Sequence, residues 1–411
     1  MRSDAVLGAA TAPGRRDRRP IVIGVPSRNE AATVGSVVTA AVEGLHAMGV
    51  IDRALLVNAD NGSRDGTPAA FASAARGVAY ECLALHAHDS GKGSNVLAIM
   101  GVAESVGAES VLLLDADVRT VEPGWVGAML EAVAGDGPVL AAPIYRRNRL
   151  EGNTTNHVVS PLLSAVFGVR VEQPIAGDFA FNAAFVRACL ERPAPASAQL
   201  YGIDVHLTGM AAREGWPIVQ VPLGRKLHNP GFPKILYGSQ QVIDSLLHAI
   251  ALLTRPRPYI EPTALPRRTV DTEISVPDRA LVAAAIAKAA RYLSANSGGI
   301  AQLFPTVKDL SGTEWGLRID EWSWAQILAD AVAALAADTL PLVRDHLVAL
   351  YLSRVMTYWQ QIESCGPEAI DELLDRQTAA VIEAVRGRGI TLPGSALPSG
   401  FEPGYWAEAA Q

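Results

Sequence analysis

The segment Val111-Leu112-Leu113-Leu114-Asp115-Ala116-Asp117 contains four consecutive apolar residues that lead directly into two acidic ones. A short apolar run of this kind is typical of a strand that is buried on both faces of a parallel sheet. Similar runs occur at residues 21–25, 55–57 and 78–83, separated by segments in which apolar residues recur every three or four positions. Strands that alternate with helices predict βαβ units and an α/β fold with a parallel sheet.

The remaining patterns divide the 411-residue chain further. Residues 255–276 are rich in Pro, Arg and Thr, which indicates a linker. Helical apolar patterns follow at residues 279–294, 322–338, 342–362 and 367–386. We therefore predict a flexible tail over residues 1–19, an α/β domain over 20–254 with halves of about 20–137 and 138–254, a linker over 255–277, and a helical C-terminal region over 278–411.

The composition excludes several classes of protein. With 49% hydrophobic and 19% charged residues, the chain has the composition of a globular protein rather than a disordered one. Its formal charge is −7 and it has no basic stripe, so we expect no nucleic-acid partner. The sequence has neither a run of eighteen apolar residues nor the pattern of a signal peptide, so we expect no membrane association. Cys82, Cys189 and Cys365 lie far apart, which predicts free thiols and a cytoplasmic protein.

Polar and acidic residues gather where the predicted strands end. Asp115 and Asp117 follow one strand, Asp60 follows another, and residues 27–30 follow the first. Ligands of parallel sheets bind beyond the carboxyl ends of the strands. Two carboxylates one residue apart can bind a hard divalent cation and share it with a phosphate. The alternative is that Asp117 caps the next turn and that Asp60 and Asp65 only stabilise theirs.

Two other segments carry basic residues that could meet an anion. Lys92 lies between two glycines at the start of a predicted helix, where the backbone can approach a ligand and the helix N-terminus favours negative charge. The spacing is not that of a Walker A loop, and a surface turn with a solvated lysine is the alternative. His228 follows the last predicted strand, directly after Arg225, Lys226 and one apolar residue. A structural histidine is the simpler interpretation, but this imidazole could also complete a metal site and the two basic side chains would suit phosphate oxygens.

Taken in this order, these segments resemble a glycosyltransferase of the GT-A fold: residues 26–30, 60–67, 91–93, 115–117 and His228. More narrowly, residues 20–250 resemble the bacterial glucosyl-3-phosphoglycerate synthase and glucosylglycerate synthase group, which is glycosyltransferase family 81 with its family 2 relatives. The narrower likeness is carried by residues 145–147, 161–163, 177–179, 201–204 and 225–228. The resemblance covers a little over half of the chain.

The resemblance implies a retaining, metal-dependent enzyme with Mg²⁺ or Mn²⁺ and a UDP- or GDP-linked sugar as donor. It implies Asp117 and His228 as the metal ligands. To the nucleotide sugar it assigns Pro26, Arg28, Glu30, Asp60, Ser63, Lys92, Asp115, Ala116 and Arg225. To catalysis it assigns Lys92, Asp178 and Asp204, and to the acceptor it assigns Tyr145, Arg146, Asn153 and Thr155. Because no residue stands out as a nucleophile, we expect attack from the same face, with the leaving phosphate taking the acceptor proton.

Two features depart from the pattern of this group. Asn153 stands where phosphoglycerate-specific relatives have an arginine, so we expect a non-phosphorylated acceptor such as glycerate. The helical region after about residue 265 has no counterpart in those synthases. Two of its helices have apolar faces, formed by Trp322, Trp324, Leu328, Val332 and Leu335 and by Leu342, Leu347, Tyr351, Val355 and Tyr358. Such faces need a partner, so we expect a homodimer to which this region contributes, the alternative being a thicker core within one chain.

Three other functions are compatible with these residues. The same donor chemistry would serve an O- or S-glycosyltransferase of natural-product pathways, such as those of lincosamide-type antibiotics. A sugar nucleotidyltransferase shares the strand-end acids and the basic loop, but it normally has a glycine-rich N-terminal loop, where this chain has residues 26–30. A nucleotide-sugar sensor could use the helical region as its output module, but it would not need both candidate metal ligands.

Overall fold

The computed structural model describes residues 5–7, 20–85, 91–229, 231–260, 262, 269–270, 276–313, 316–398 and 400–407. The chain forms two compact units. Unit 1 comprises residues 1–146, 176–194 and 198–229, and unit 2 comprises residues 147–175, 195–197 and 230–411. Within the predicted tail, residues 5–7 form a strand that pairs with another strand of unit 1, and the rest of residues 1–19 lies outside the described residues.

The division into units differs from the predicted one. Residues 147–175 and α8 (Ile235–Ala251), which we expected in the α/β domain, belong to unit 2. There, α8 contacts α12 (Leu340–Gln361), and residues 160–167 contact α13 (Pro367–Gly387). The apolar pattern of a helix shows that one face needs a partner but does not identify that partner. The boundary could therefore not be found from the pattern alone.

Unit 1 is built on a mainly parallel sheet. The strands lie in the order β1 (Ala5–Leu7), β4 (Ala79–Ala84), β3 (Ala54–Asp60), β2 (Ile21–Ser27), β5 (Ser110–Leu113), β7 (Ala180–Asn182), β6 (Leu140–Arg147) and β8 (Ile218–Arg225). The pairs β4–β3, β3–β2, β2–β5 and β6–β8 are parallel. β1 is antiparallel to β4, and β7 is antiparallel to both of its neighbours. The predicted α/β class is confirmed.

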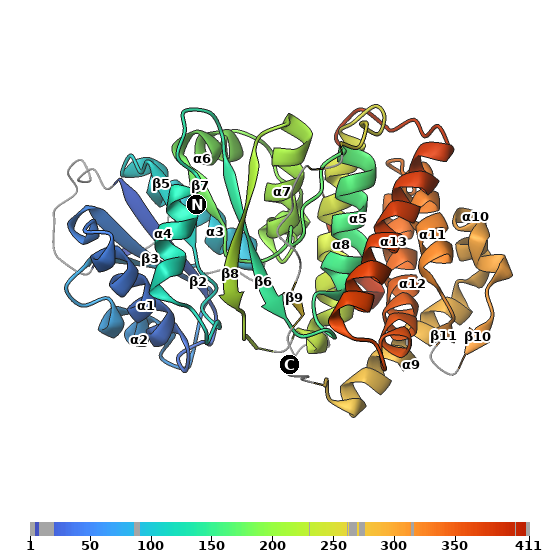
Figure 1. The fold of residues 1–411 in the computed structure, drawn as a ribbon, viewed down its shortest axis with the longest axis horizontal. Helices are drawn as coiled ribbons and strands as arrows, with labels where there is room; N and C mark the ends of the chain where they lie inside the picture. The colour runs from blue at the N-terminus through green and yellow to red at the C-terminus, as the bar shows by residue number, and fades with distance from the viewer. Residues whose placement is uncertain are drawn as a thin grey trace. The chain divides into compact units, whose positions relative to one another are not determined.

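Helices cover both faces of this sheet (Figure 1). They are α1 (Val34–Ala47), α2 (Thr67–Ala74), α3 (Lys92–Ser105), α4 (Pro123–Glu131), α6 (Ala183–Leu190) and α7 (Ile203–Glu214). Because side chains alternate along a strand, Ile23 and Val25 of β2 face the core that contains α1 and α4. Gly24 faces the opposite side, where an added Cβ would lie 2.4 Å from Ile99 of α3. The glycine thus lets α3 pack closely against the sheet.

Unit 2 is mainly helical. Two π-helical stretches, Thr155–Val159 and Leu163–Phe167, flank α5 (Ser160–Leu162), and the later helices are α8, α9 (Arg279–Ala295), α10 (Ser297–Leu303), α11 (Glu321–Ala333), α12 and α13. The four C-terminal helices predicted from the sequence are confirmed as α9, α11, α12 and α13. Short strands occur at β9 (Thr269–Val270) and in the hairpin of β10 (Gly312–Thr313) and β11 (Gly316–Leu317). Short 3₁₀ helices span Ile51–Arg53 in unit 1, Phe232–Lys234, Pro305–Asp309 and Gly404–Trp406 in unit 2, and Ala196–Gln199.

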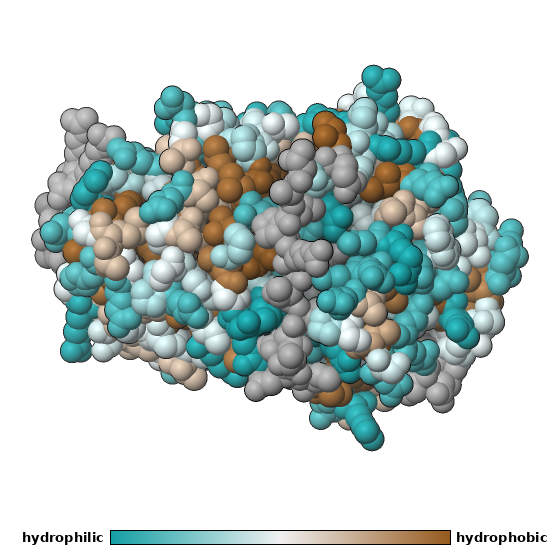
Figure 2. Space-filling model, in the orientation of Figure 1, coloured by the Kyte–Doolittle hydropathy of each residue, from teal (hydrophilic) through white to brown (hydrophobic). Residues whose placement is uncertain are grey.

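The apolar faces of the C-terminal helices are buried within unit 2 itself. Trp324 of α11 and Tyr351 of α12 are fully buried, as are most of the residues that we expected to cover a dimer interface. Of the ten residues of these two faces, only Trp322 and Leu342 are exposed, at 57% and 52% of their surface. The visible outer side of α13 is largely hydrophilic (Figure 2). The helices bury these faces against one another and against α8 and residues 155–167, which is the alternative of a thicker core within one chain. The homodimer stays a prediction.

No helix in the described part of the chain combines the length and apolarity that crossing a membrane requires. The three cysteines are free thiols, as predicted.

Candidate functional site

The carboxyl ends of the parallel strands in unit 1 bring the predicted site segments together. Ser27 at the end of β2 pairs in register with Asp60 at the end of β3. Asn229, next to His228, donates its backbone N–H to Asp117 Oδ2 (3.1 Å). The side-chain amide of Asn229 donates to Glu30 Oε2 (3.1 Å). Four segments far apart in the sequence thus meet at this edge of the sheet, those of Ser27, Asp60, Asp117 and His228.

The turn after β3 fixes the loop that follows β2. Asn29, which has a φ of 58°, donates its N–H to Ser63 Oγ (2.7 Å), and Ser63 Oγ donates to Asp60 Oδ2 (2.5 Å). Asp60 also accepts from Ser27 Oγ (3.1 Å) and is 5% exposed. Asp60 and Ser63 therefore stabilise the conformation of the loop through hydrogen bonds. This is the structural role in a turn that the sequence offered as the alternative for Asp60. Arg28 is exposed at its tip, and the nucleotide-binding roles of Pro26, Arg28, Asp60 and Ser63 stay predictions.

Near these loops, the strand ends carry a cluster of lysines and carboxylates in which Lys92 and Asp115 are partly buried and Lys226 and Asp178 are buried. Lys92 Nζ lies 2.8 Å from Asp115 and 3.3 Å from Asp204. Lys226 Nζ lies 3.1 Å from the other oxygen of Asp115 and 2.6 Å from Asp178, and it donates to the carbonyl oxygen of Ala176 (2.7 Å). Asp115 is thus held between two ammonium groups.

The environment of this cluster shifts the pKa of its members in different directions. Burial would lower the pKa of Lys92, but the charges of Asp115 and Asp204 outweigh burial and raise it. Burial would raise the pKa of Asp115, but Lys92 and Lys226 outweigh it and hold the pKa well below the usual range. The pKa of Asp117 is raised by burial and then by the charge of Asp115. Burial also raises the pKa of Asp204, against the opposing effect of Lys92.

Asp178 and Tyr145 lie inside unit 1 and not at its surface. Asp178 is fully buried and accepts from the backbone N–H of Asp115 (2.7 Å), from Tyr145 OH (2.8 Å) and from Lys226. Tyr145 is also fully buried, and its ring lies 5.0 Å from that of Trp125. The polar atoms of both side chains are engaged by partners within unit 1. The sugar contact of Asp178 and the acceptor contact of Tyr145 stay predictions, and both would require these buried side chains to be reached from the surface.

The structure places Lys226, and not Arg225, among the carboxylates of the site. Arg225 ends β8, and its carbonyl oxygen accepts from Thr120 Oγ1 (2.6 Å). Lys226, the next residue, is 3% exposed. Sequence reasoning noted both residues as phosphate partners but selected Arg225. The signal that could have identified Lys226 is its position directly beyond a strand, in a chain whose other strand ends are acidic.

Asp117 and His228 stay the predicted ligands of a divalent cation, and the hydrogen bond from Asn229 brings their segments together. His228 Nδ1 lies 2.7 Å from the carbonyl oxygen of Asn229, and because a carbonyl oxygen only accepts, Nδ1 is the donor in this contact. Metal-bound histidines commonly donate their second N–H in this way. Among the described residues, no group of three or more His, Cys, Asp or Glu side chains could hold a metal. A cation here would take its remaining ligands from phosphate oxygens and water, as Mg²⁺ usually does.

Two glycines of the site serve packing inside the protein. A Cβ on Gly93 would lie 1.9 Å from the carbonyl oxygen of Ala198, and the Gly93 N–H donates to Leu200 O (2.9 Å). Gly177, with φ +92°, allows its loop to approach Asp115, since a Cβ there would lie 1.9 Å from a carboxylate oxygen. The sequence suggested that the glycines beside Lys92 let the backbone approach a phosphate. For Gly93 the structure corrects this: the close approach is to residues 198–200.

The four predicted acceptor residues fall in both units. Tyr145 and Arg146 belong to unit 1, where Arg146 is exposed, and Asn153 and Thr155 belong to unit 2. The Asn153 amide donates to Leu150 O (2.8 Å) and accepts from Trp359 Nε1 (3.3 Å). Thr155 is 2% exposed. Asn153 and Thr155 are therefore internal to unit 2, and their acceptor role stays a prediction.

No family model matches this sequence, and no curated protein matches it. Solved structures are similar to it. A mycobacterial protein is 26% identical, with a TM-score of 0.47 over 56% of this chain and 75% of that chain. Glucosyl-3-phosphoglycerate synthase from Mycobacterium tuberculosis in complex with phosphoglyceric acid is 25% identical, with a TM-score of 0.47 over 56% of this chain and 80% of that chain. The same synthase in complex with Mn²⁺ and uridine-diphosphate-glucose is 26% identical, with a TM-score of 0.46 over 56% and 79%. This synthase is a member of the group that the motifs resemble, and because the likeness is partial, we take the function from the site's own residues.

Proposed function

We propose that this chain is a retaining, divalent-metal-dependent glycosyltransferase that moves a hexose-type sugar from a UDP- or GDP-linked donor to a small polar acceptor such as glycerate. The observation that carries the proposal is the pair of hydrogen bonds made by Asn229. One bond goes to Asp117 and the other to Glu30. The segment of His228, the Asp117 carboxylate and the loop after β2 therefore meet at the carboxyl edge of the sheet. This edge is where parallel sheets bind nucleotides.

The diphosphate of the donor is the group that most needs stabilisation in such a reaction, because negative charge builds on it as the sugar leaves. Asp117 Oδ and His228 Nε2 would hold a Mg²⁺ or Mn²⁺ ion there, which would supply electrostatic stabilisation of the leaving group. Lys92 and Lys226 add positive charge nearby, but their ammonium groups are already shared with Asp115, Asp178 and Asp204. Their main effect is therefore to fix the carboxylates and, with them, the position of Asp117.

The accessibility of the carboxylates supports the proposed retention of configuration. A double displacement needs a carboxylate that can reach the anomeric carbon. Asp178 is buried with three donors, and Asp115 is held by two lysines, so both are unsuited to attack. Asp204 keeps a side-chain exposure of 11% at the start of α7 and remains available to orient a sugar hydroxyl. These placements favour same-face attack, in which the leaving phosphate accepts the acceptor proton.

A non-phosphorylated acceptor and a cytoplasmic location are part of the same proposal. Both polar ends of the uncharged Asn153 amide are engaged within unit 2, so this position offers no charged fork to a phosphate. The three free thiols suit a reducing compartment.

The test is a transfer assay with UDP-glucose and GDP-glucose, Mg²⁺ or Mn²⁺, and either glycerate or 3-phosphoglycerate. We expect a glycerate product whose NMR anomeric coupling matches that of the donor. An inverted product would refute retention, and a roughly tenfold higher efficiency with 3-phosphoglycerate, about 1.4 kcal/mol of transition-state stabilisation, would refute the acceptor. A protein that binds the donor without turnover on any acceptor would instead be a sensor.

A further inference from the structure

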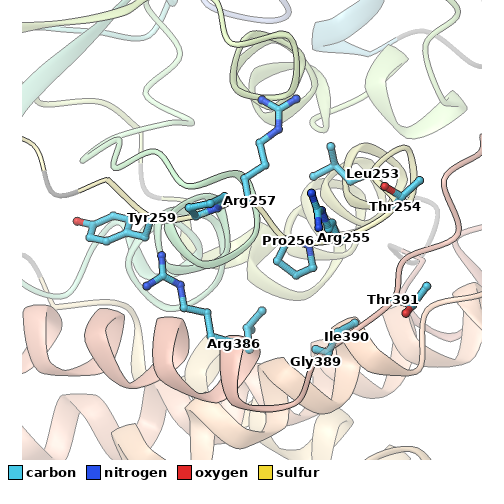
Figure 3. Close-up of a pocket in the computed structure, with 12 residues that line it drawn as sticks. Leu253, Thr254, Arg255, Pro256, Arg257, Tyr259, Arg386, Gly389, Ile390 and Thr391 are labelled. Atoms are coloured by element: carbon cyan, nitrogen blue, oxygen red, sulfur yellow. The ribbon is translucent and has the colours of Figure 1, made fainter.

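Unit 2 contains a cleft that the proposed glycosyl transfer does not use. Its volume is about 1000 Å³, which is at the upper end of the sizes found for small-molecule sites. One wall is the segment 253–259 that follows α8, and the other is the end of α13 with residues 389–391 (Figure 3). The cleft therefore lies between two segments that are more than 120 residues apart in the sequence.

The walls of this cleft are fixed by backbone hydrogen bonds. The Arg257 N–H donates to Val166 O (2.8 Å), which ties the first wall to the second π-helical stretch. Thr254 O accepts from Leu392 N–H and Leu253 O accepts from Gly394 N–H, each at 2.9 Å. Pro256 and Pro258 restrict the same segment further. A site that is formed before binding spends little free energy on ordering.

The side chains that line the cleft give it a positive charge. Arg255, Arg257 and Arg386 are among the twelve lining residues, and none of the twelve is acidic, although the whole chain carries a formal charge of −7. Figure 3 shows Arg386 reaching from α13 toward Tyr259, and its guanidinium lies 5.9 Å from the centre of that ring. In the same view Arg257 extends away from α13, and the other two lining arginines are Arg255 and Arg386.

These two arginines differ from other arginines of unit 2. Arg344 pairs with Asp244 and Asp345, and Arg388 pairs with Asp330. Within the described part of the chain, the guanidinium groups of Arg255 and Arg386 have no hydrogen bond and no ion pair, and that of Arg386 contacts the Tyr259 ring. Their donors are therefore available to a ligand.

We propose that this cleft is a binding site for a small phosphorylated anion of nucleotide size. Guanidinium groups bind phosphate oxygens through paired hydrogen bonds. Leu253, Val385 and Ile390 provide a buried apolar floor, and Tyr259 provides an aromatic wall for the organic part of such a ligand. The site is separate from the metal-dependent site of unit 1 and needs no metal.

The proposal is tested by isothermal titration of the full-length protein with ADP and with inorganic pyrophosphate, in EDTA and at low salt. We expect one-to-one binding of at least one of the two probes, weakened at least tenfold in R255Q/R386Q. Tighter binding of ADP would indicate that Tyr259 and the apolar floor contribute, and equal binding would indicate that the phosphates suffice; both support the site. The variant D117A should bind the probe as the parent does, which separates this cleft from the site in unit 1.

The control is R279Q/R376Q, which removes the same charge from exposed positions on α9 and α13. If both double variants lose the same affinity, or if neither probe binds the parent protein, the cleft is not an anion site. Circular dichroism checks the fold of each variant, and should R255Q/R386Q misfold, the single changes R255Q and R386Q decide in its place. Each should weaken binding at least threefold, and unchanged affinity in both would overturn the proposal.

Discussion

Lys226 is the residue on which the candidate site most visibly depends. Its Nζ lies within 3.1 Å of acceptors on Asp115, Asp178 and Ala176, and its side chain is 3% exposed. Removal of one partner from a buried ion pair leaves an uncompensated charge, which is more costly than the pair is stabilising.

We therefore expect K226M to lower the free energy of unfolding by about 3–5 kcal/mol. Urea titration followed by circular dichroism measures this, with the exposed Lys308 changed to Met as the control. A loss of less than about 1 kcal/mol, the upper range for an exposed ion pair, would contradict the arrangement.

Asp117 and His228 are predicted to act on chemistry and not on stability. Both are partly exposed at the edge of the sheet, so D117A and H228A remove ligands and little packing. We expect each change to lower the transfer rate by more than the roughly 10- to 100-fold that loss of an outer-shell partner of a metal costs. The assay is donor turnover with Mg²⁺ or Mn²⁺, with thermal melts as the check on folding. Full activity of both variants, or of the parent in excess EDTA, would rule out the metal site.

His248 of α8 predicts a pH dependence of stability. Burial would lower its pKa, but hydrogen bonds to Asp244 and to Pro398 O outweigh burial and raise it. A histidine with a raised pKa stabilises the folded state fully below its unfolded pKa of about 6.5, and this contribution is lost as the pH rises through the folded value. H248Q should therefore destabilise the protein more at pH 5.5 than at pH 9 in urea titrations. An equal or larger effect at pH 9 would contradict the sign.

At the level of elements, helix α3 depends on a glycine at one position and only tolerates one at another. Gly93 packs against the carbonyl oxygen of Ala198, and Gly101 on the same helix has nothing within 4 Å of an added Cβ. We expect G93A to destabilise unit 1 by about 1–3 kcal/mol through overpacking. G101A should stabilise it by about 0.5–1 kcal/mol because alanine favours the helix. Thermal melting curves of the two variants measure both effects. A G93A protein as stable as the parent would show that residues 198–200 can move away.

The π-helical stretch Thr155–Val159 illustrates how a later element supports an irregular one. A π-helix departs from the usual i→i−4 pattern, and here two of its carbonyl oxygens accept from side chains of the C-terminal helices. Trp324 Nε1 donates to His157 O (2.5 Å), and Gln377 Nε2 donates to Asn156 O (2.9 Å). Gln377 Oε1 also accepts from Arg354 Nε (2.9 Å). The C-terminal helices thus hold the segment that carries Asn153 and Thr155.

At the level of the whole molecule, the C-terminal helices are part of the core of unit 2. Asp244 of α8 is fully buried and pairs with Arg344 of α12 (3.1 Å). A chain that ends after Arg255 loses this partner and all the helices that cover α8 and residues 155–167. We expect rapid cleavage of residues 147–175 and 235–251 in the truncated chain, measured by limited proteolysis with mass spectrometry against the full-length protein. Equal protection in both chains would mean that these segments are stable without the C-terminal helices.

Much of unit 1 could be predicted from the sequence, because local patterns determine local structure. The apolar runs at residues 21–25, 55–57 and 111–114 correspond to β2, β3 and β5, and the acidic and polar residues after them meet at one edge of the sheet. This follows from the geometry of parallel strands, whose carboxyl ends share an edge. Asp117 and the segment of His228 were brought together as expected, since both follow strands of the same sheet.

The remaining features depended on contacts between residues far apart in the sequence. Lys226 and Arg225 are both basic and adjacent, and only the packing around Asp178 determines which of them is buried. Tyr145 and Asp178 belong to motifs of the resemblance, but the motifs do not indicate that both side chains are fully buried. The helical faces of residues 322–358 were correctly identified as needing a partner, yet a helix pattern does not say whether that partner lies in the same chain. Here the partner is α8 and the segment 155–167 of the same unit, and this depends on long-range packing that no local pattern specifies.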